Sequence, residues 1–144
     1  MAITYNDKYR IRRNVDHAEI MQKLQNLKIF DGYSTILCYS AILGYLHEQF
    51  IPFDKSAEPV QISFFSPTDH NLMDFLAFAH EKNTAILHEE GDKKYNIFSF
   101  YANGGFPILL KELGIDVTTN ISQLNEQKIS QDLYAMTISN QQNI

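Results

Sequence analysis

The sequence has few of the features that staple, anchor or export a protein. Only Cys38 among the 144 residues is a cysteine, so an internal disulfide is excluded and a reducing, cytoplasmic setting is expected. The first residues, MAITYNDKYRIRR, contain no apolar run of the kind that a secretory signal carries. No stretch reaches the roughly 20 predominantly apolar residues that a transmembrane helix needs, so no contact with a membrane is expected.

Motifs of the common nucleotide-dependent and metal-dependent enzymes are also missing. The chain has no Walker A sequence and no GxGxxG, and its five histidines show no HExxH spacing. The acids of the turn EEGDKK (89–94) share residue types with a nuclease cluster, but they precede a predicted helix, whose dipole they favour. Cys38 lies in the most apolar segment and is expected to be an inert core residue. We therefore expect a protein that is not an enzyme, with no catalytic residues, metal or cofactor.

Charge is distributed unevenly along the chain. Residues 1–13 carry +3, because Lys8, Arg10, Arg12 and Arg13 face a single acid, and residues 14–144 carry −8, because the whole chain carries −5. We predict that residues 1–13 form a basic N-terminal arm. Its interleaved tyrosines and arginines fit a contact with nucleic acid phosphates and bases, a contact with an acidic partner, or packing onto the protein's own body.

The segment 33–49, YSTILCYSAILGYLHEQ, is predicted to be the central helix. Its apolar residues cover nearly the full circumference of a helix, which is typical of a buried helix. Gly44 inside it costs about 1 kcal/mol relative to alanine, so we expect another helix or an aromatic ring to approach closely there. Truncation of Leu43 to alanine is expected to destabilise the core by about 2–5 kcal/mol.

Four further helices and one short extended segment are predicted around the central helix. The first helix begins with a capping-box pattern at Asp16 and Glu19, and the third shows an apolar stripe at Leu72, Phe75, Leu76 and Ala79. The alternation in Val60–Phe64 indicates a short strand whose partner is either 9–11 or 84–87. The predicted helices span 15–27, 68–83, 92–102 and 106–113, with a weak helical pattern over 120–139.

The last two of these helices are predicted to be separate. Asn103-Gly104-Gly105 indicates a break or tight turn, and Pro107 is tolerated in the first turn of a new helix. A Gly-Gly turn that binds an anion through its N–H groups is the weaker alternative, because Pro107 lacks one of the donors. The sequence thus predicts a mainly α fold: a compact bundle of about five helices with at most a small β element, a single helical domain over 14–139, and a disordered tail at 140–144.

Three stretches carry a resemblance to a known family. They are RIRRNVDHAEIMQKL, IFDGYSTILCYSAILGYLHEQ and YNIFSFYANGGFPILLKELG, of which the run YANGGF (101–106) is the most specific. In order and spacing, over roughly residues 10–114, the chain resembles the DNA phosphorothioation-associated (Dnd system-associated) protein 4 family. It departs from that family at Pro107, where the family prefers a helix former.

The resemblance implies a bacterial accessory protein of a system that replaces a phosphate oxygen of DNA with sulfur or restricts unmodified DNA, in defence against phage. It carries over no catalytic residue. Our first hypothesis is a non-enzymatic adaptor that contacts other proteins of the defence system, with homo-oligomerisation left open. The alternative is a small DNA-binding regulator that contacts phosphates through Lys8, Arg10, Arg12 and Arg13, with a steep salt dependence.

Overall fold

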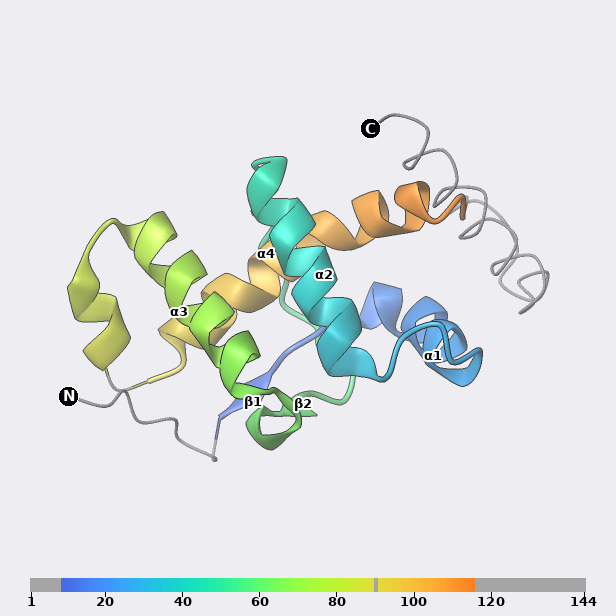
Figure 1. Cartoon of the computed structure of the whole chain (residues 1–144), viewed down its shortest axis with the longest axis horizontal. Coiled ribbons are helices and arrows are strands. Elements are labelled where there is room, and N and C mark those ends of the chain that lie inside the picture. The colour runs from blue at the N-terminus through green and yellow to red at the C-terminus, as the bar shows by residue number, and fades with distance from the viewer. Residues whose placement is uncertain (1–8, 90, 116–144) are drawn as a thin grey trace.

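A computed structural model describes residues 9–89 and 91–115 of the chain (Figure 1). The predicted mainly α class is confirmed, with four α-helices, short 3-10 segments and one two-stranded sheet in the described part. The elements are β1 (Arg10–Ile11), η1 (Val15–His17), α1 (Ala18–Asn26), α2 (Tyr33–Leu46), β2 (Val60–Gln61), η2 (Ile62–Phe64), α3 (Pro67–Glu81), η3 (Thr84–His88) and α4 (Lys93–Glu112). Lys8, the weak helical pattern over 120–139 and the predicted tail at 140–144 lie outside the described residues.

The fold is organised around the crossing of α2 and α4, which form the most extensive contact between elements. In Figure 1 these two helices cross at the middle of the molecule, with α1 to one side and α3 to the other. Gly44 of α2 faces the carbonyl carbon of Tyr101, which would lie 2.9 Å from a Cβ at that glycine. The predicted close approach at Gly44 is therefore confirmed, and its partner is a helix backbone.

The helix α4 is continuous where the sequence predicted a break. Gly104 and Gly105 lie inside it and are buried against α2 and the residues that follow α2. A Cβ at Gly105 would lie 2.5 Å from the nitrogen of Gly44, so only glycine permits this contact. The expectation of about five helices therefore falls to four in the described residues, because tertiary packing outweighs the local preference of Asn-Gly-Gly for a turn.

Helix starts differ from the predicted caps by a few residues. Asn14 Oδ1, not Asp16, accepts a hydrogen bond at the start of η1, from the Asp16 N–H at 2.9 Å. At α3, Ser66 and Asp69 form a capping box, so the helix begins just before residue 68, where the sequence placed its start. Pro67 then occupies the first turn, where its missing N–H is not needed.

The buried face of α3 is shifted from the predicted stripe. It buries Met73, Leu76 and Ala77, while Phe75 is 54% exposed. Asp74 also points inward, where it pairs with Lys94 of α4 at 2.8 Å. The buried face of α3 thus includes a carboxylate, so a stripe defined by apolar residues alone did not predict its position correctly.

The small sheet fixes the start of the described chain to the body. β1 pairs antiparallel with β2, with Arg10 opposite Gln61 and Ile11 opposite Val60. The first of the two partners predicted for the extended segment, residues 9–11, is therefore the correct one. Ile11 is fully buried in the core. No helix in the described residues is long and apolar enough to cross a membrane.

Candidate functional site

The basic residues singled out in the sequence take different positions. Arg10 is exposed on β1. Arg12 donates from Nη2 to the carbonyl oxygens of Phe53 and Asp54, at 3.3 and 2.7 Å, and its guanidinium lies over the Phe53 ring. Arg13 is only 8% exposed. The three arginines therefore do not form one open phosphate-binding patch.

Arg13 holds the loop before β2 against the start of α2. Its backbone N–H donates to Ser56 Oγ at 3.2 Å, its carbonyl oxygen accepts from the Ala57 N–H at 2.9 Å, and its Nε donates to the Glu58 carbonyl at 3.0 Å. Its guanidinium carbon lies 4.2 Å from the centre of the Tyr33 ring. Nη1 is buried without a hydrogen-bond partner. No carboxylate of the described residues lies within ion-pair distance of this cation.

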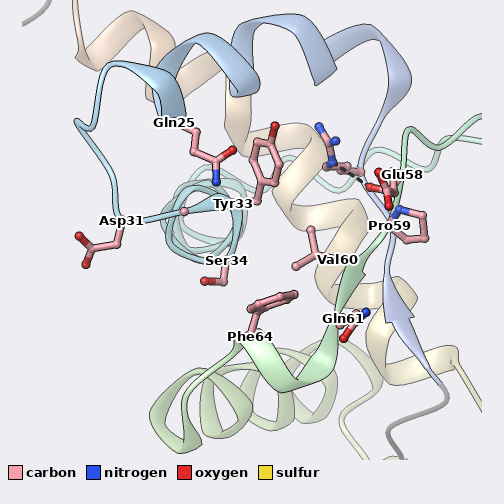
Figure 2. A pocket seen from close by; sticks show the side chains of 11 residues that line it. Gln25, Asp31, Tyr33, Ser34, Glu58, Pro59, Val60, Gln61 and Phe64 are labelled. Carbon is pink, nitrogen blue, oxygen red and sulfur yellow. Dashed lines mark hydrogen bonds between the residues drawn. The ribbon is translucent and has the colours of Figure 1, made fainter.

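A cavity of about 560 Å³ opens beside Arg13. Figure 2 shows Tyr33, Val60 and Phe64 along its wall, with Gln25 and Ser34 from α1 and α2 and Gln61 from β2. Asp31 and Glu58 are exposed at its edge, on opposite sides of the start of α2, and the Asp31 carboxylate points away from Val60 and Phe64. We refer to this space as the Arg13 cavity; its volume lies within the range of small-molecule sites, about 300–1,000 Å³.

The N-terminus of α2 opens into the Arg13 cavity. Gly32 is the N-cap residue and supplies no side-chain cap, and the first turn of α2 contains no acidic residue. The first N–H groups of a helix have no partner within the helix, and together they carry a partial positive charge. The cavity therefore combines two sources of positive potential, the Arg13 guanidinium and the start of α2.

A second surface lies on the outward side of α2, where the sequence predicted burial all round. Tyr39, Ile42 and Leu46 are 52%, 38% and 67% exposed, while Ile36, Leu37 and Ala41 are fully buried. The central position of α2 is confirmed, but its burial on every side is wrong, because α1 and α3 contact it far less than α4 does.

The exposed side of α2 continues onto α3. Phe75 and Phe78, one turn apart on α3, are 54% and 43% exposed. Tyr45 of α2 meets the Phe75 ring edge-on at 5.7 Å, which joins the two helices. We call the set formed by Tyr39, Ile42, Leu46, Phe75 and Phe78 the α2–α3 face.

Two hollows flank the exposed side of α2. One, of about 470 Å³, is lined by Tyr39 of α2, Phe30 of the preceding loop, and Leu109 and Leu113 at the end of α4. The other, of about 440 Å³, is lined by Leu46, Tyr45 and Phe50. Hollows beside an exposed apolar stripe are suited to anchoring side chains of a partner.

Burial shifts the pKa values of three side chains, Cys38, His17 and His70, toward the neutral form. Burial, with the Asp69 carboxylate nearby, raises the pKa of the Cys38 thiol well above its usual value. Burial lowers the pKa values of His17 and His70. Among residues 9–89 and 91–115, no group of three or more His, Cys, Asp or Glu side chains is arranged to hold a metal ion.

Neither the Arg13 cavity nor the α2–α3 face was identified from the sequence. Arg13 follows Ile11 and Arg12 in the sequence. Nothing in this pattern distinguishes a buried arginine from a solvated one. For α2 a signal was present, since a helix apolar on all sides predicts contacts in every direction. The sequence could not show that neighbours within the described chain cover only part of it.

The described residues define a small helical protein with two helices that cross at backbone contact, an apolar outward face and a cavity lined in part by a cation. Comparison with protein families adds a specific assignment. The model of the DNA sulphur modification system-associated protein 4 family matches residues 10–141, and the chain belongs to this family. Searches of curated proteins and of solved structures gave no match.

Proposed function

We propose that the chain is a non-enzymatic accessory protein that binds another protein of the DNA sulphur-modification system through the α2–α3 face, and that it acts in this way in phage defence. Membership in the family supports the association with such a system. The observation that carries the mode of action is the exposed apolar side of α2.

The spacing of the exposed residues favours a partner that lies along α2. Tyr39, Ile42 and Leu46 are separated by three and four residues and therefore share one side of the helix. Apolar residues scattered singly over a surface need no explanation, whereas a contiguous apolar patch marks a contact site. Phe75 and Phe78 extend the patch with aromatic side chains, which are enriched at the centre of protein interfaces.

The charge of the chain supports a protein partner over bare DNA. Residues 14–144 carry −8, and a negative body repels a polyanion. Arg12 and Arg13, which the DNA-binding alternative requires, are bound to carbonyl groups of the 53–58 loop. The exposed Arg10 on β1 is the described residue on which that alternative now depends.

The proposal is tested by co-expression with the other proteins of the modification system. We expect the chain to co-purify with one of them, and the double variant Tyr39→Ala/Leu46→Ala to weaken that complex by about tenfold or more, because truncation of a buried interface anchor typically costs 1–2 kcal/mol or more. Both side chains are at least half exposed, so the melting temperature of the variant should stay close to that of the parent chain.

A matched control uses exposed apolar residues elsewhere. Val15 and Ile51 are 43% and 44% exposed and lie outside the α2–α3 face, so Val15→Ala/Ile51→Ala should leave the complex unchanged. The proposed interface is refuted if both double variants bind alike. The proposed function is refuted if the parent chain co-purifies with no protein of the system.

A further inference from the structure

Arg13, which lines the cavity, is a cation with no counter-ion within ion-pair distance among the described residues. An arginine remains charged in proteins, and a buried charge is costly unless it is paired and hydrogen-bonded. The Tyr33 ring and the Glu58 carbonyl oxygen compensate part of that charge. Nη1 is buried and makes no hydrogen bond, so the pairing of this guanidinium is incomplete.

The start of α2 adds a second, independent preference for negative charge in the same cavity. Gly32, Tyr33 and Ser34 line the cavity, and no side chain caps the helix there. A helix N-terminus presents N–H groups to an anion, and the helix dipole favours it. With 14 residues, α2 is long enough for this effect to be established.

The remaining walls define the rest of the ligand. Val60 and the rings of Tyr33 and Phe64 give the cavity an apolar side (Figure 2). The exposed acids Asp31 and Glu58 at its edge disfavour an anion of high charge. A single carboxylate carries one negative charge, which balances the one positive charge of Arg13. A ring or a branched chain attached to it would fill the apolar part.

We propose that the Arg13 cavity binds a small organic anion, one carboxylate on a compact apolar body, with the carboxylate at the first N–H groups of α2 and within the positive potential of Arg13. This site is distinct from the α2–α3 face, and neither proposal depends on the other. Such a ligand would also tie the 53–58 loop to the start of α2, since Arg13 contacts both.

The experiment is a titration of the ¹⁵N-labelled full chain with three probes, followed by NMR. Sodium benzoate carries the carboxylate and the ring, benzyl alcohol carries the ring alone, and inorganic phosphate carries charge alone. We expect benzoate to shift the amide signals of Tyr33 and Ser34 and the Nε–H signal of Arg13 saturably, with one dissociation constant. Benzyl alcohol should leave these signals in place, and phosphate should bind more weakly than benzoate.

A variant that supplies its own anion provides the decisive comparison. Ser34→Asp places a carboxylate in the first turn of α2, a position that helices favour, so the fold should be retained. It should weaken benzoate binding by about tenfold or more, as expected when a charged hydrogen-bonded site is already filled. Asn71→Asp adds the same charge at an exposed position of α3 that does not line the cavity. It should change the affinity for benzoate by less than about twofold.

Three results would overturn the proposal. Benzoate shifts that do not saturate, or that spread over the surface, would show that Arg13 is only a structural link. Equal binding of phosphate and benzoate would remove the apolar body from the ligand. Equal affinities for Ser34→Asp and Asn71→Asp would place the bound carboxylate away from the start of α2.

Discussion

The substitution Gly105→Ala tests the crossing on which the fold depends. A Cβ at Gly105 would lie 2.5 Å from the nitrogen of Gly44 and 2.7 Å from the carbonyl carbon of Ser40, with the Ser40 oxygen nearer still. Contacts below 3.0 Å are essentially never found for real Cβ atoms, and all three atoms belong to the backbone of α2. No side-chain rotation can relieve the overlap, so the two helices would have to separate by more than about 1 Å to reach normal contact distances.

The expected size of the effect follows from two opposing contributions. Alanine is favoured over glycine inside a helix by about 1 kcal/mol. Overpacking of a well-packed core typically costs about 1–3 kcal/mol and occasionally more, and here the overlap is with backbone across the most extensive interface of the described fold. The overpacking cost should therefore lie at the upper end of this range, about 3 kcal/mol or more. Subtracting the preference for alanine leaves a net loss of about 2 kcal/mol or more, which for a domain of this size lowers the melting temperature by roughly 6 °C or more.

Thermal unfolding followed by circular dichroism measures this loss, with Gly32→Ala as the control. A Cβ at Gly32 would meet only Gln25 Nε2, at 4.0 Å, and the backbone there is extended. The control should lower the free energy of unfolding by about 1 kcal/mol or less, because alanine is less favourable than glycine at an N-cap. A melting temperature for Gly105→Ala equal to that of Gly32→Ala would show that α2 and α4 do not cross at backbone contact.

Four further predictions follow from individual residues. Asn103→Ala should cost about 1–3 kcal/mol of unfolding free energy in chemical denaturation, because Asn103 donates to the Ile51 carbonyl oxygen and accepts from Asn14 Nδ2. Leu37→Ala should lower the free energy of unfolding by about 2–5 kcal/mol. The loss should exceed that of Leu43→Ala, because Leu37 is 1% exposed and Leu43 is only partly buried. The same denaturation experiment would contradict this prediction if Leu43→Ala were the more destabilising of the two. Burial lowers the pKa of His17 and so favours its neutral form in the folded state. The contribution of His17 to stability is therefore present above the unfolded pKa of about 6.5 and is lost as the pH falls below that value. Between pH 7.5 and pH 5, the melting temperature should fall less steeply for His17→Phe than for the parent chain. In gel-shift assays at low salt we expect no shift of duplex DNA, and a shift that Arg10→Ala abolishes would favour the DNA-binding alternative.

The sequence was sufficient for those parts of the fold that local patterns specify. The apolar run of α2 located the central helix, and Gly44 within it indicated a close approach that α4 supplies. The alternation over Val60–Phe64 predicted a strand and, as one of two choices, its partner; the strand covers only Val60–Gln61, and Ile62–Phe64 forms a 3-10 turn. Each of these signals is local and was not opposed by a stronger tertiary effect.

The errors arose where tertiary contacts outweigh local preference. The residues Asn103, Gly104 and Gly105 favour a turn in isolation, but inside α4 the glycines allow contact with α2 and Asn103 bonds to two other segments. On α3, the ion pair of Asp74 with Lys94 placed a charge on the buried face. The residues that make each of these contacts are far apart in the sequence, so no helical periodicity could reveal the contacts.

For the two candidate surfaces, the limit was that core and interface use the same residue types. The sequence cannot separate Leu37 from Leu46, because both are leucines of one apolar helix, yet one is 1% and the other 67% exposed. Likewise Arg13 belongs to a run of basic residues in which Arg10 and Arg12 are more exposed than Arg13. The difference between these residues is set by what the rest of the chain covers.

The crossing also explains why the outward side of α2 remains available to a partner. Gly44, Gly104 and Gly105 bring two backbones into contact, and a helix held at that distance cannot rotate without a steric clash. Tyr39, Ile42 and Leu46 therefore cannot turn inward to escape water. A partner that binds these three exposed side chains, as proposed, would meet a surface that the crossing already holds in place, so little ordering of the protein would be required. Substitutions at those three positions should accordingly alter complex formation, while substitutions at the glycines should alter the fold itself.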